Sequence, residues 1–579
     1  MEKTKRSRAV PNALLATGII FTLLSYFAGI LLTILGVLLL VVSYFFYTYI
    51  KLKEKNEENP GKYVFDTTVM VKWGFIIVGG LLAYSGMATL THWPLYTGFA
   101  LILVGLVLLS VYGLGVVKKV STKSSSKPDD HGSASWNTSE QLSKVLDVDK
   151  GLSIGGGWRW GKSGHLVSVA GSGKGKGTCL IIPSLLVEPN GSYVVTDPKG
   201  ENACITAGYQ AVGVGQKVFI LDPWDEQKKL GAIHGLPTSG FNPFVFLKND
   251  MEELRDNCEL IATYLVPDNQ EAKDPFWNDR ARSMIKIFLM HIITAMPEKD
   301  HNFWTLYKML RYADDQWLAL LIDLQNNMAE DELISISAQE LMGIEKSGNT
   351  MASIKSTAQN ATTIFESPQL RKSLATDDFN PYDLTDGNCT VYVVIPERYM
   401  ETHAVWLRLV IGLCLKACNS KPNKRVNFLL DEFPVLGKMK DVQRGYAFAR
   451  GQNIVLWAFA QSLSQLKDIY GEDGMGVLIN NSAILQFFGV KDNYTTEYIS
   501  KMLGDGTQTK ASTTTSDTGT STNFQTFGRR LLTPDEVEKC ANIITTANGL
   551  RGQLPPIPYF MDENIKAHAA PRPRAEHSF

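Results

Sequence analysis

The sequence has almost no net charge. Its 57 lysines and arginines are balanced by 58 aspartates and glutamates, which leaves a formal net charge of −1 at pH 7. Proteins that bind nucleic acids or acidic membranes through their overall charge are strongly basic, so the composition excludes that mode of binding. Any contact with a polyanion must come from a local patch of the surface.

Cysteine and histidine are also scarce, with 7 and 9 residues in a chain of 579. The closest cysteine pair, Cys414 and Cys418, lies in an apolar run at helical spacing, with no second pair and no histidine ligand close by. A zinc site or a disulfide framework needs a denser arrangement of ligands. The sequence therefore predicts buried, reduced thiols.

Apolar residues, in contrast, are concentrated near the N-terminus. Residues 13–50 are almost entirely apolar, and one helix of that length would be nearly twice as long as the ~30 Å hydrocarbon layer of a membrane. Basic clusters precede this segment, follow residue 50 and follow residue 117, which is the arrangement of cytoplasmic ends. We therefore predict a transmembrane domain of about four helices over residues 1–120, in the inner membrane, with the rest of the chain in the cytoplasm. The predicted spans are residues 12–27, 30–49, 71–91 and 95–117.

A glycine-rich loop follows the apolar run 165–170 and precedes an apolar helix start at Cys179. Glycines let successive backbone N–H groups face a phosphate chain, and the N-terminus of the next helix adds a positive dipole. Lys176 adds a cation for the β- and γ-phosphates. The loop therefore predicts an ATP site. Its residues are Gly171, Ser172, Gly173, Lys174, Gly175, Lys176, Gly177 and Thr178.

This loop departs at two positions from the usual pattern, which is G-x-x-x-x-G-K followed by Ser or Thr. Ala170 stands in place of the first glycine, and Gly177 stands in place of the hydroxyl residue that holds Mg²⁺. Thr178 or a water molecule is expected to take over that ligand position.

A second part of the site is expected at Asp431 and Glu432, which directly follow the hydrophobic strand 426–430. In a nucleoside triphosphatase, one carboxylate at such a strand end holds the magnesium shell and another orients the attacking water. We assign the magnesium role to Asp431, with Thr178, and the catalytic role to Glu432. Many α/β proteins end a strand with an acidic residue, so this prediction depends on the pairing with Lys176.

The next predicted strand, 454–459, is followed closely by Gln461. In RecA-like motors a polar residue at this position senses the γ-phosphate, so Gln461 joins Lys176 and Glu432 as a catalytic residue. A glutamine that only caps the following helix is the alternative.

Further strands are expected from short runs of β-branched and aromatic residues that alternate with helical segments. This alternation predicts an α/β fold, a RecA-like nucleotide-binding domain with a mostly parallel sheet and its site at the carboxyl ends of the strands. The runs are residues 193–196, 218–221, 390–395 and 484–488.

Composition divides the rest of the chain. The RecA-like domain is expected over residues 151–250 and 376–566, and the strand signal vanishes over 251–375, which predicts an inserted all-α domain. Residues 121–150 are expected to form a linker, and residues 567–579 a disordered tail.

Several short strings occur in order along this region. They are Gly175-Lys176-Gly177, Thr196-Asp197-Pro198-Lys199-Gly200-Glu201, Phe241-Asn242-Pro243, Asp274-Pro275-Phe276-Trp277, Val393-Val394-Ile395-Pro396, Leu430-Asp431-Glu432-Phe433, Gln461-Ser462-Leu463-Ser464-Gln465-Leu466 and Leu531-Leu532-Thr533-Pro534-Asp535-Glu536-Val537. Together they resemble the type IV secretion coupling proteins, the TraG/TraD-like branch of the FtsK/HerA motor superfamily. The resemblance covers most of residues 150–560.

The resemblance implies an inner-membrane ATPase that uses ATP and Mg²⁺ to drive macromolecules into a type IV secretion channel. It also implies a homo-hexameric ring, contacts with channel subunits of the inner membrane, and a cargo that is either DNA with its relaxase or a protein effector. An FtsK-like translocase of double-stranded DNA and a substrate receptor that does not hydrolyse ATP are the alternative functions.

In such rings an arginine of the neighbouring subunit completes each ATP site. The candidates here are Arg444, Arg450, Arg529 and Arg530. Separately, the Ser- and Thr-rich stretch 507–522 has few apolar residues, and we expect it to be a mobile loop.

Overall fold

The computed structural model describes residues 131–187, 191–267, 275–420, 424–516 and 519–571. The chain divides into two compact units near residue 127, and the described residues all belong to the second. The four predicted membrane spans lie outside the described residues. Within the described ranges, no helix is both long enough and apolar enough to cross a membrane.

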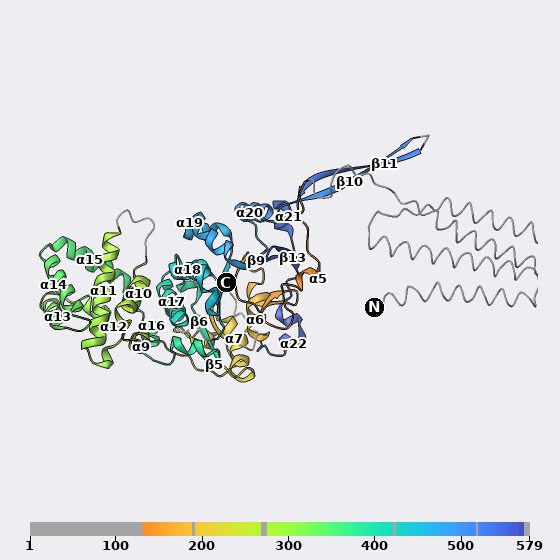
Figure 1. Ribbon diagram of the computed structural model, residues 1–579. Helices are drawn as coiled ribbons and strands as arrows, with labels where there is room; N and C mark the ends of the chain where they lie inside the picture. Colours follow the sequence, from red (N-terminus) through yellow and green to blue (C-terminus); the bar gives the residue numbers. More distant parts are fainter. Residues whose placement is uncertain (1–130, 188–190, 268–274, 421–423, 517–518, 572–579) are drawn as a thin grey trace, which may run out of the picture. The chain divides into compact units, whose positions relative to one another are not determined.

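A nine-stranded sheet forms the centre of this unit, in the order β13-β12-β9-β3-β8-β7-β4-β6-β5 (Figure 1). The seven strands from β9 to β5 run parallel to their neighbours, and β12 and β13 are added antiparallel at one edge. The predicted α/β fold with a mostly parallel sheet is thereby confirmed. The strands are β3 (His165–Ala170), β4 (Ser192–Asp197), β5 (Lys217–Leu221), β6 (Cys389–Val394), β7 (Val426–Leu430), β8 (Ile454–Ala460), β9 (Ser482–Phe488), β12 (Ile543–Ala547) and β13 (Leu550–Leu554).

The inner strands are buried along their whole length. Every residue of β3, β4, β6, β7 and β8 is buried, as expected for parallel strands that are covered by helices on both faces. Among the covering helices, α19 contacts β3, β8 and β9, while α18 contacts β8. The helices outside the insertion are α5 (Ser139–Leu142), α6 (Ile182–Val187), α7 (Glu201–Gly208), α8 (Glu226–Lys229), α9 (Pro243–Asn249), α17 (Ala404–Ser420), α18 (Lys440–Phe448), α19 (Leu463–Asn480), α20 (Asn493–Leu503), α21 (Pro534–Lys539) and α22 (Glu563–Lys566).

A group of helices is inserted between β5 and β6, and its described residues contain no strand. It joins the sheet layer where α10 packs on α17 (Figure 1). A Cβ at Gly412 of α17 would lie 2.2 Å from Cζ of Tyr264, so glycine is required for this close approach. The inserted helices are α10 (Leu254–Leu265), α11 (Phe276–Ala295), α12 (Phe303–Met309), α13 (Asp314–Asn326), α14 (Leu333–Glu345), α15 (Gly348–Ala361) and α16 (Pro368–Ser373).

The hydroxyl-rich stretch 507–522, expected from the sequence to be a mobile loop, lies in a β-hairpin over its described residues. β10 (Asp505–Ser516) and β11 (Gly519–Arg530) pair along their full length and with no strand of the central sheet. The backbone N–H and C=O groups of the two strands pair with one another, and this pairing does not require an apolar face. A second small ribbon joins β1 (Leu152–Gly155) to β2 (Trp158–Trp160).

Segments predicted as linker and tail are partly built into the fold. In the linker, Ser133 bridges Gly506 at the root of the hairpin, and α5 contributes the buried Leu142 to the core. In the tail, the His568 ring stacks on Tyr209 at a centroid distance of 4.3 Å. Apolar and aromatic side chains thus anchor both segments. Residues 572–579 lie outside the described residues.

The core thiols agree with the sequence prediction. All 7 cysteines are free, and all but Cys540 are buried. Burial raises the pKa of Cys418 to about 12, which keeps this thiol protonated and unreactive at neutral pH.

Tyr446 of α18 provides a test of sheet cohesion. Its buried hydroxyl donates to the Leu166 carbonyl at 2.7 Å and accepts from the Ala458 N–H at 3.0 Å, so it bridges β3 and β8. Tyr446→Phe leaves two buried backbone groups without this partner, and we expect the free energy of unfolding to fall by about 1–3 kcal/mol. Denaturant unfolding of the purified chain measures the change. Tyr209→Phe, which keeps its stacked ring, is the control, and equal stabilities of the two variants would contradict the bridging role.

Candidate nucleotide site

Three neighbouring strands bring the predicted site residues to one edge of the sheet. β8 lies between β3 and β7, and all three are parallel, so their carboxyl ends point the same way. The glycine loop follows β3, Gln461 follows β8, and Asp431 follows β7. Loops from distant parts of the chain therefore meet at this edge.

The glycine loop has the backbone shape that a phosphate cradle requires. Gly173 and Gly175 have φ angles of +69° and +92°, a left-handed region that side chains with a Cβ rarely adopt. Ser172, Gly173 and Lys174 are exposed at the turn, whereas Lys176 is buried to 9% exposure. Only the second lysine of the loop is thus directed into the protein.

The helix after the loop begins with a wide turn. Residues Gly177–Ile181 form a π-helix, in which the Ile182 N–H reaches the Gly177 carbonyl five residues back. Such a turn holds one residue more than an α-helical turn. At this turn the hydroxyl of Thr178 lies against the loop and donates to the Gly175 carbonyl at 3.4 Å.

Lys176 contacts both carboxylates that follow β7. Its Nζ lies 2.7 Å from Glu432 Oε1 and 3.7 Å from Asp431 Oδ1. The side chains of Lys176, Asp431 and Glu432 are 10%, 16% and 22% exposed, so water screens these charges only partly. Two segments 256 residues apart in the sequence are thus joined by a hydrogen-bonded ion pair.

The backbone at the two carboxylates has an unusual conformation. The Glu432 N–H donates to Asp431 Oδ1 at 3.0 Å, and Glu432 itself adopts φ +50°. A left-handed, non-glycine residue stores strain that tends to occur at functional sites. Burial raises the pKa of Asp431, and the Lys176 charge acts in the opposite direction.

Gln461 completes the cluster from β8. Its Nε2 donates to Glu432 Oε2 at 3.2 Å, and its own N–H donates to Gln465 Oε1 at 3.2 Å. Glu432 is therefore held between a lysine and an amide, one on each carboxylate oxygen. A glutamine that only caps the following helix would not make this contact with Glu432.

Sequence reasoning missed three supporting residues. On β4, the Thr196 hydroxyl donates to the Asp431 carbonyl at 2.8 Å, and Asp197 accepts from the Ala203 N–H at 2.9 Å. Asp492, the N-cap residue of α20, accepts from the Ser464 hydroxyl at 2.8 Å, just beyond Gln461. The acidic end of β4 was a visible signal, because β4 is a predicted parallel strand that ends in Thr-Asp.

The candidate arginines differ in their surroundings. Arg529 pairs with Glu536 at 2.5 Å, and Arg530 pairs with Glu497 at 3.0 Å. Arg444 is 73% exposed and lies 4.0 Å from Asp441. The side chain of Arg450 lies outside the described residues.

The donor set suits a metal that keeps most of its water. In the described part of the chain, no group of three or more His, Cys, Asp or Glu side chains could hold a metal ion. Mg²⁺ is usually bound through one or two carboxylates together with substrate phosphates. Asp431 beside a glycine loop fits that requirement.

Comparisons with known proteins give a consistent family. The family model described as type IV secretory system conjugative DNA transfer matches residues 125–576. The conjugal transfer protein TraG of Agrobacterium fabrum is 24% identical over 70% of this chain and 66% of its own length. The type IV secretion system-coupling protein VirD4 of Bartonella quintana is 23% identical over 70% of this chain and 68% of its own length.

A solved structure supports the fold. The plasmid coupling protein TrwB, in complex with ADP and Mg²⁺, superposes with a TM-score of 0.54 at 16% identity, over 72% of this chain and 92% of that one. At this identity the likeness concerns the fold alone.

The buried Asp197 carboxyl predicts a pH effect on stability. Burial raises its pKa to about 7, whereas an unfolded aspartate titrates near pH ~4. Between these values the folded chain binds more protons than the unfolded chain, so this group makes stability fall as pH rises, by up to about 1.4 kcal/mol per pH unit. Asp197→Asn should flatten that fall in denaturant unfolding measured at several pH values. The exposed Asp468→Asn is the control, and an unchanged slope for Asp197→Asn would contradict the assignment.

Proposed function

Because the chain belongs to the type IV secretory system conjugative DNA transfer family, we propose that it is a coupling ATPase that feeds macromolecules into a type IV secretion channel. The family resemblance noted in the motifs is thereby confirmed. The observation that carries the ATPase proposal is the contact of Lys176 with Glu432 and Asp431. A receptor without hydrolysis has no need for a carboxylate held between a lysine and Gln461.

The side chains of the site have separate tasks in ATP hydrolysis. The loop N–H groups and Lys176 bind the phosphates, and Lys176 offsets the negative charge that builds up between the β- and γ-positions. Glu432 orients the attacking water and accepts its proton. Gln461 contacts Glu432 at 3.2 Å, so it fixes the direction of this carboxylate and senses the γ-phosphate.

Asp431 and Thr178 are the proposed holders of Mg²⁺. Asp431 would hold the ion through its water shell, and the Thr178 hydroxyl, which lies 3.4 Å from the Gly175 carbonyl, would serve as a ligand. Mg²⁺, when bound, supplies positive charge that neutralises the phosphate oxygens. The pairing of Asp431 with Lys176 at 3.7 Å already shows that this carboxylate faces a cation.

The N-terminal 120 residues are proposed to anchor the motor in the inner membrane, with the described unit in the cytoplasm. The apolar content of residues 13–50 and the basic clusters at the segment ends support this arrangement. The anchor is also the proposed contact with channel subunits. The domain limits given above for the RecA-like and all-α parts are proposed on the same sequence grounds.

The proposed class of cargo is inferred from the family. Relatives are named for conjugal transfer and for type IV secretion, so we expect DNA with its attached relaxase, or protein effectors, as cargo. A homo-hexameric ring is the proposed assembly, with one arginine of each subunit reaching its neighbour's ATP site. Arg444 is the most exposed described candidate, at 73%.

Substitution of the carboxylate and the lysine should separate ATP binding from hydrolysis. Glu432→Gln should lower phosphate release by about 100-fold or more while ATP still binds, because Glu432 acts on water. Lys176→Ala should lose both ATP binding and hydrolysis, because it removes the cation that contacts the phosphates. Lys228→Ala, on an exposed turn of α8, is the control for loss of a lysine. Near-normal turnover by Glu432→Gln would exclude Glu432 as the catalytic carboxylate.

If each ATP site is shared between two subunits, hydrolysis should depend on assembly of the ring. Specific activity should rise with protein concentration until the ring is complete, because each site needs an arginine from a neighbour. Mixtures of Lys176→Ala with a variant of the trans arginine should regain activity, since some interfaces then combine two intact faces. Alanine variants at Arg444, Arg450, Arg529 and Arg530 identify that residue. The ring mechanism fails if specific activity is flat while oligomeric state changes and no mixture complements.

A further inference from the structure

The segment that follows β8 carries Gln461 into the nucleotide site and then enters α19. Ser462 caps this helix, because its Oγ accepts from the Gln465 N–H at 3.2 Å. The Gln465 side chain in turn accepts from the Gln461 N–H at 3.2 Å. These bonds lie within residues 461–465, so they do not fix the segment against another helix.

The N-terminus of α20 provides that connection. The Leu463 N–H donates to the Thr495 hydroxyl at 2.9 Å, and the Ser464 hydroxyl donates to Asp492 Oδ2 at 2.8 Å. Asp492 Oδ2 also accepts from the Thr495 N–H at 2.9 Å. One carboxylate therefore caps α20 and binds the neighbouring segment at the same time.

The bond to Thr495 is one that the protein cannot easily lose. Leu463 is the first residue of α19, so its N–H has no partner inside that helix. Leu463 and Thr495 are both buried, and a buried N–H without a partner carries the full cost of desolvation. Residues 463 and 464 should therefore follow any shift of α20, and Gln461 lies two residues before them.

α20 is held in its turn at the root of the β10–β11 hairpin. Arg530 is the last residue of β11, and its Nη1 lies 3.0 Å from both carboxylate oxygens of Glu497 and 3.2 Å from the Ser500 hydroxyl. The buried Ser500 hydroxyl donates to the Leu532 carbonyl at 2.6 Å. α20 contacts both β11 and α21 in this region (Figure 1).

These contacts give Arg530 a partner inside its own subunit. The Arg530 side chain is 34% exposed, compared with 73% for Arg444. To reach the ATP site of a neighbour, Arg530 would have to break its contacts with Glu497 and Ser500. A charged hydrogen bond to both oxygens of a carboxylate is among the stronger contacts of a protein surface, so this arginine is better suited to holding α20.

We propose that Asp492 and Thr495 are positioning residues for Gln461, and that Arg530 acts within its own subunit by fixing the helix that carries them. The inference rests on the proposed ATPase function and names the residues that set the geometry of its γ-phosphate sensor. Gln461 contacts Glu432 at 3.2 Å, so a displaced α20 would misplace both side chains relative to the attacking water.

Thr495→Val tests the positioning role in the full chain. The variant keeps the shape of the side chain and removes the acceptor of the Leu463 N–H. The kcat for ATP hydrolysis should fall by about 10–100-fold, because small misplacements of catalytic groups have effects of this size. The KM for ATP should stay the same, because the glycine loop and Lys176 bind the nucleotide. Thr495→Ser keeps the hydroxyl and should restore most of the rate.

Thr496→Val is the matched control. Thr496 is buried on the same turn, and its hydroxyl donates to the Asp492 and Asn493 carbonyls at 3.2 Å, within the start of α20. Thr496→Val should leave kcat unchanged even if denaturant unfolding shows a loss of stability. Ser464→Ala, at a partly exposed position, removes the bond to Asp492 and should lower kcat several-fold, which keeps the test valid if Thr495→Val folds poorly.

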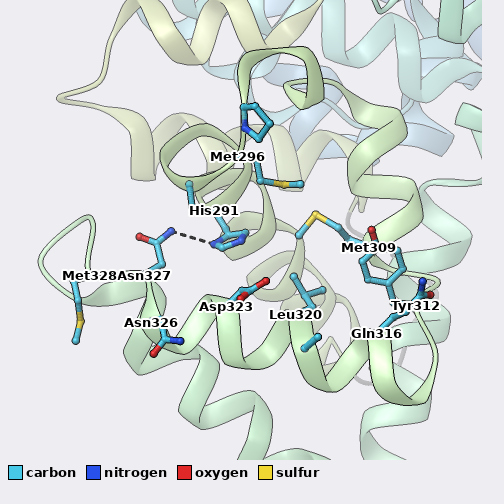
Figure 2. Close-up of a pocket in the computed structure, with 13 residues that line it drawn as sticks. His291, Met296, Met309, Tyr312, Gln316, Leu320, Asp323, Asn326, Asn327 and Met328 are labelled. Carbon is cyan, nitrogen blue, oxygen red and sulfur yellow. Dashed lines mark hydrogen bonds between the residues drawn. The ribbon is translucent and has the colours of Figure 1, made fainter.

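A remote control comes from the inserted helices. Figure 2 shows a cavity of about 700 Å³ there, and none of its lining residues belongs to the contacts around α20. Asn326 lines this cavity from an exposed position on α13. Asn326→Ala should therefore leave kcat and KM unchanged.

Two further measurements separate a positioning role from a general loosening of the fold. In a Gln461→Ala background, Thr495→Val should lower kcat no further, because its effect passes through Gln461. Binding of ADP with aluminium fluoride, which mimics the γ-phosphate in the transition state, should weaken in Thr495→Val although ATP binding does not.

The role of Arg530 is tested in the same assays. Arg530→Ala should lower kcat and leave KM unchanged. Lys501→Ala, which removes another cation 3.5 Å from Glu497 and does not reach the hairpin, should have no effect on kcat. A mixture of Arg530→Ala with Lys176→Ala should regain no activity, because each change disables the site of the subunit that carries it.

Three results would overturn the proposal. They are equal kcat values for Thr495→Val and Thr496→Val, effects of Thr495→Val and Gln461→Ala that multiply, and recovery of activity when Arg530→Ala is mixed with Lys176→Ala. Each of them leaves the proposed function standing, since the wild type still hydrolyses ATP. A wild type without hydrolysis would contradict the proposed function itself, and the positioning role with it.

Discussion

The parallel pairing of β3, β8 and β7 is the constraint on which the rest of the described structure depends. Each of the three strands is buried along its length, so apolar side chains cover both faces and their register cannot slip without exposing them. Because the strands are parallel, the carboxyl ends of all three lie at one edge of the sheet. The ion pair of Lys176 with Glu432 at 2.7 Å is a consequence of that pairing, because neither loop alone could hold its charge largely buried.

The position of the helical insertion preserves this arrangement. It enters between β5 and β6, and β5 is an outer strand of the sheet, so the strands of the site keep their neighbours. Among the contacts that join the two regions, the hydroxyl of Tyr264 on α10 donates to Asp441 Oδ2 at 2.9 Å. Asp441 lies on α18, which follows the carboxylates of β7. The inserted helices and the proposed hydrolytic site are thus connected through packed helices.

Most of the central sheet could be predicted from the sequence, because buried parallel strands such as 454–459 are short, continuous apolar runs. The hairpin could not, because its threonines favour strands but do not alternate with apolar residues, and the periodic signal of a half-buried strand is absent. The left-handed backbone of Glu432 and the contacts of Asp492 were also beyond sequence reasoning, since both arise from packing between distant segments. The placement of Lys176 and Gln461 could be predicted because the glycine loop follows β3 and Gln461 directly follows β8.

The wide turn at Gly177–Ile181 bears on how such loops are related to one another. A single added residue in a helix normally rotates everything after it by about 100°, which would carry the apolar side of the helix away from the sheet. A π turn confines the addition to one place, so Leu180 and Ile181 remain in the core. The wide turn therefore keeps the apolar side of the helix against the sheet although Gly177 stands where the usual loop pattern has a hydroxyl residue.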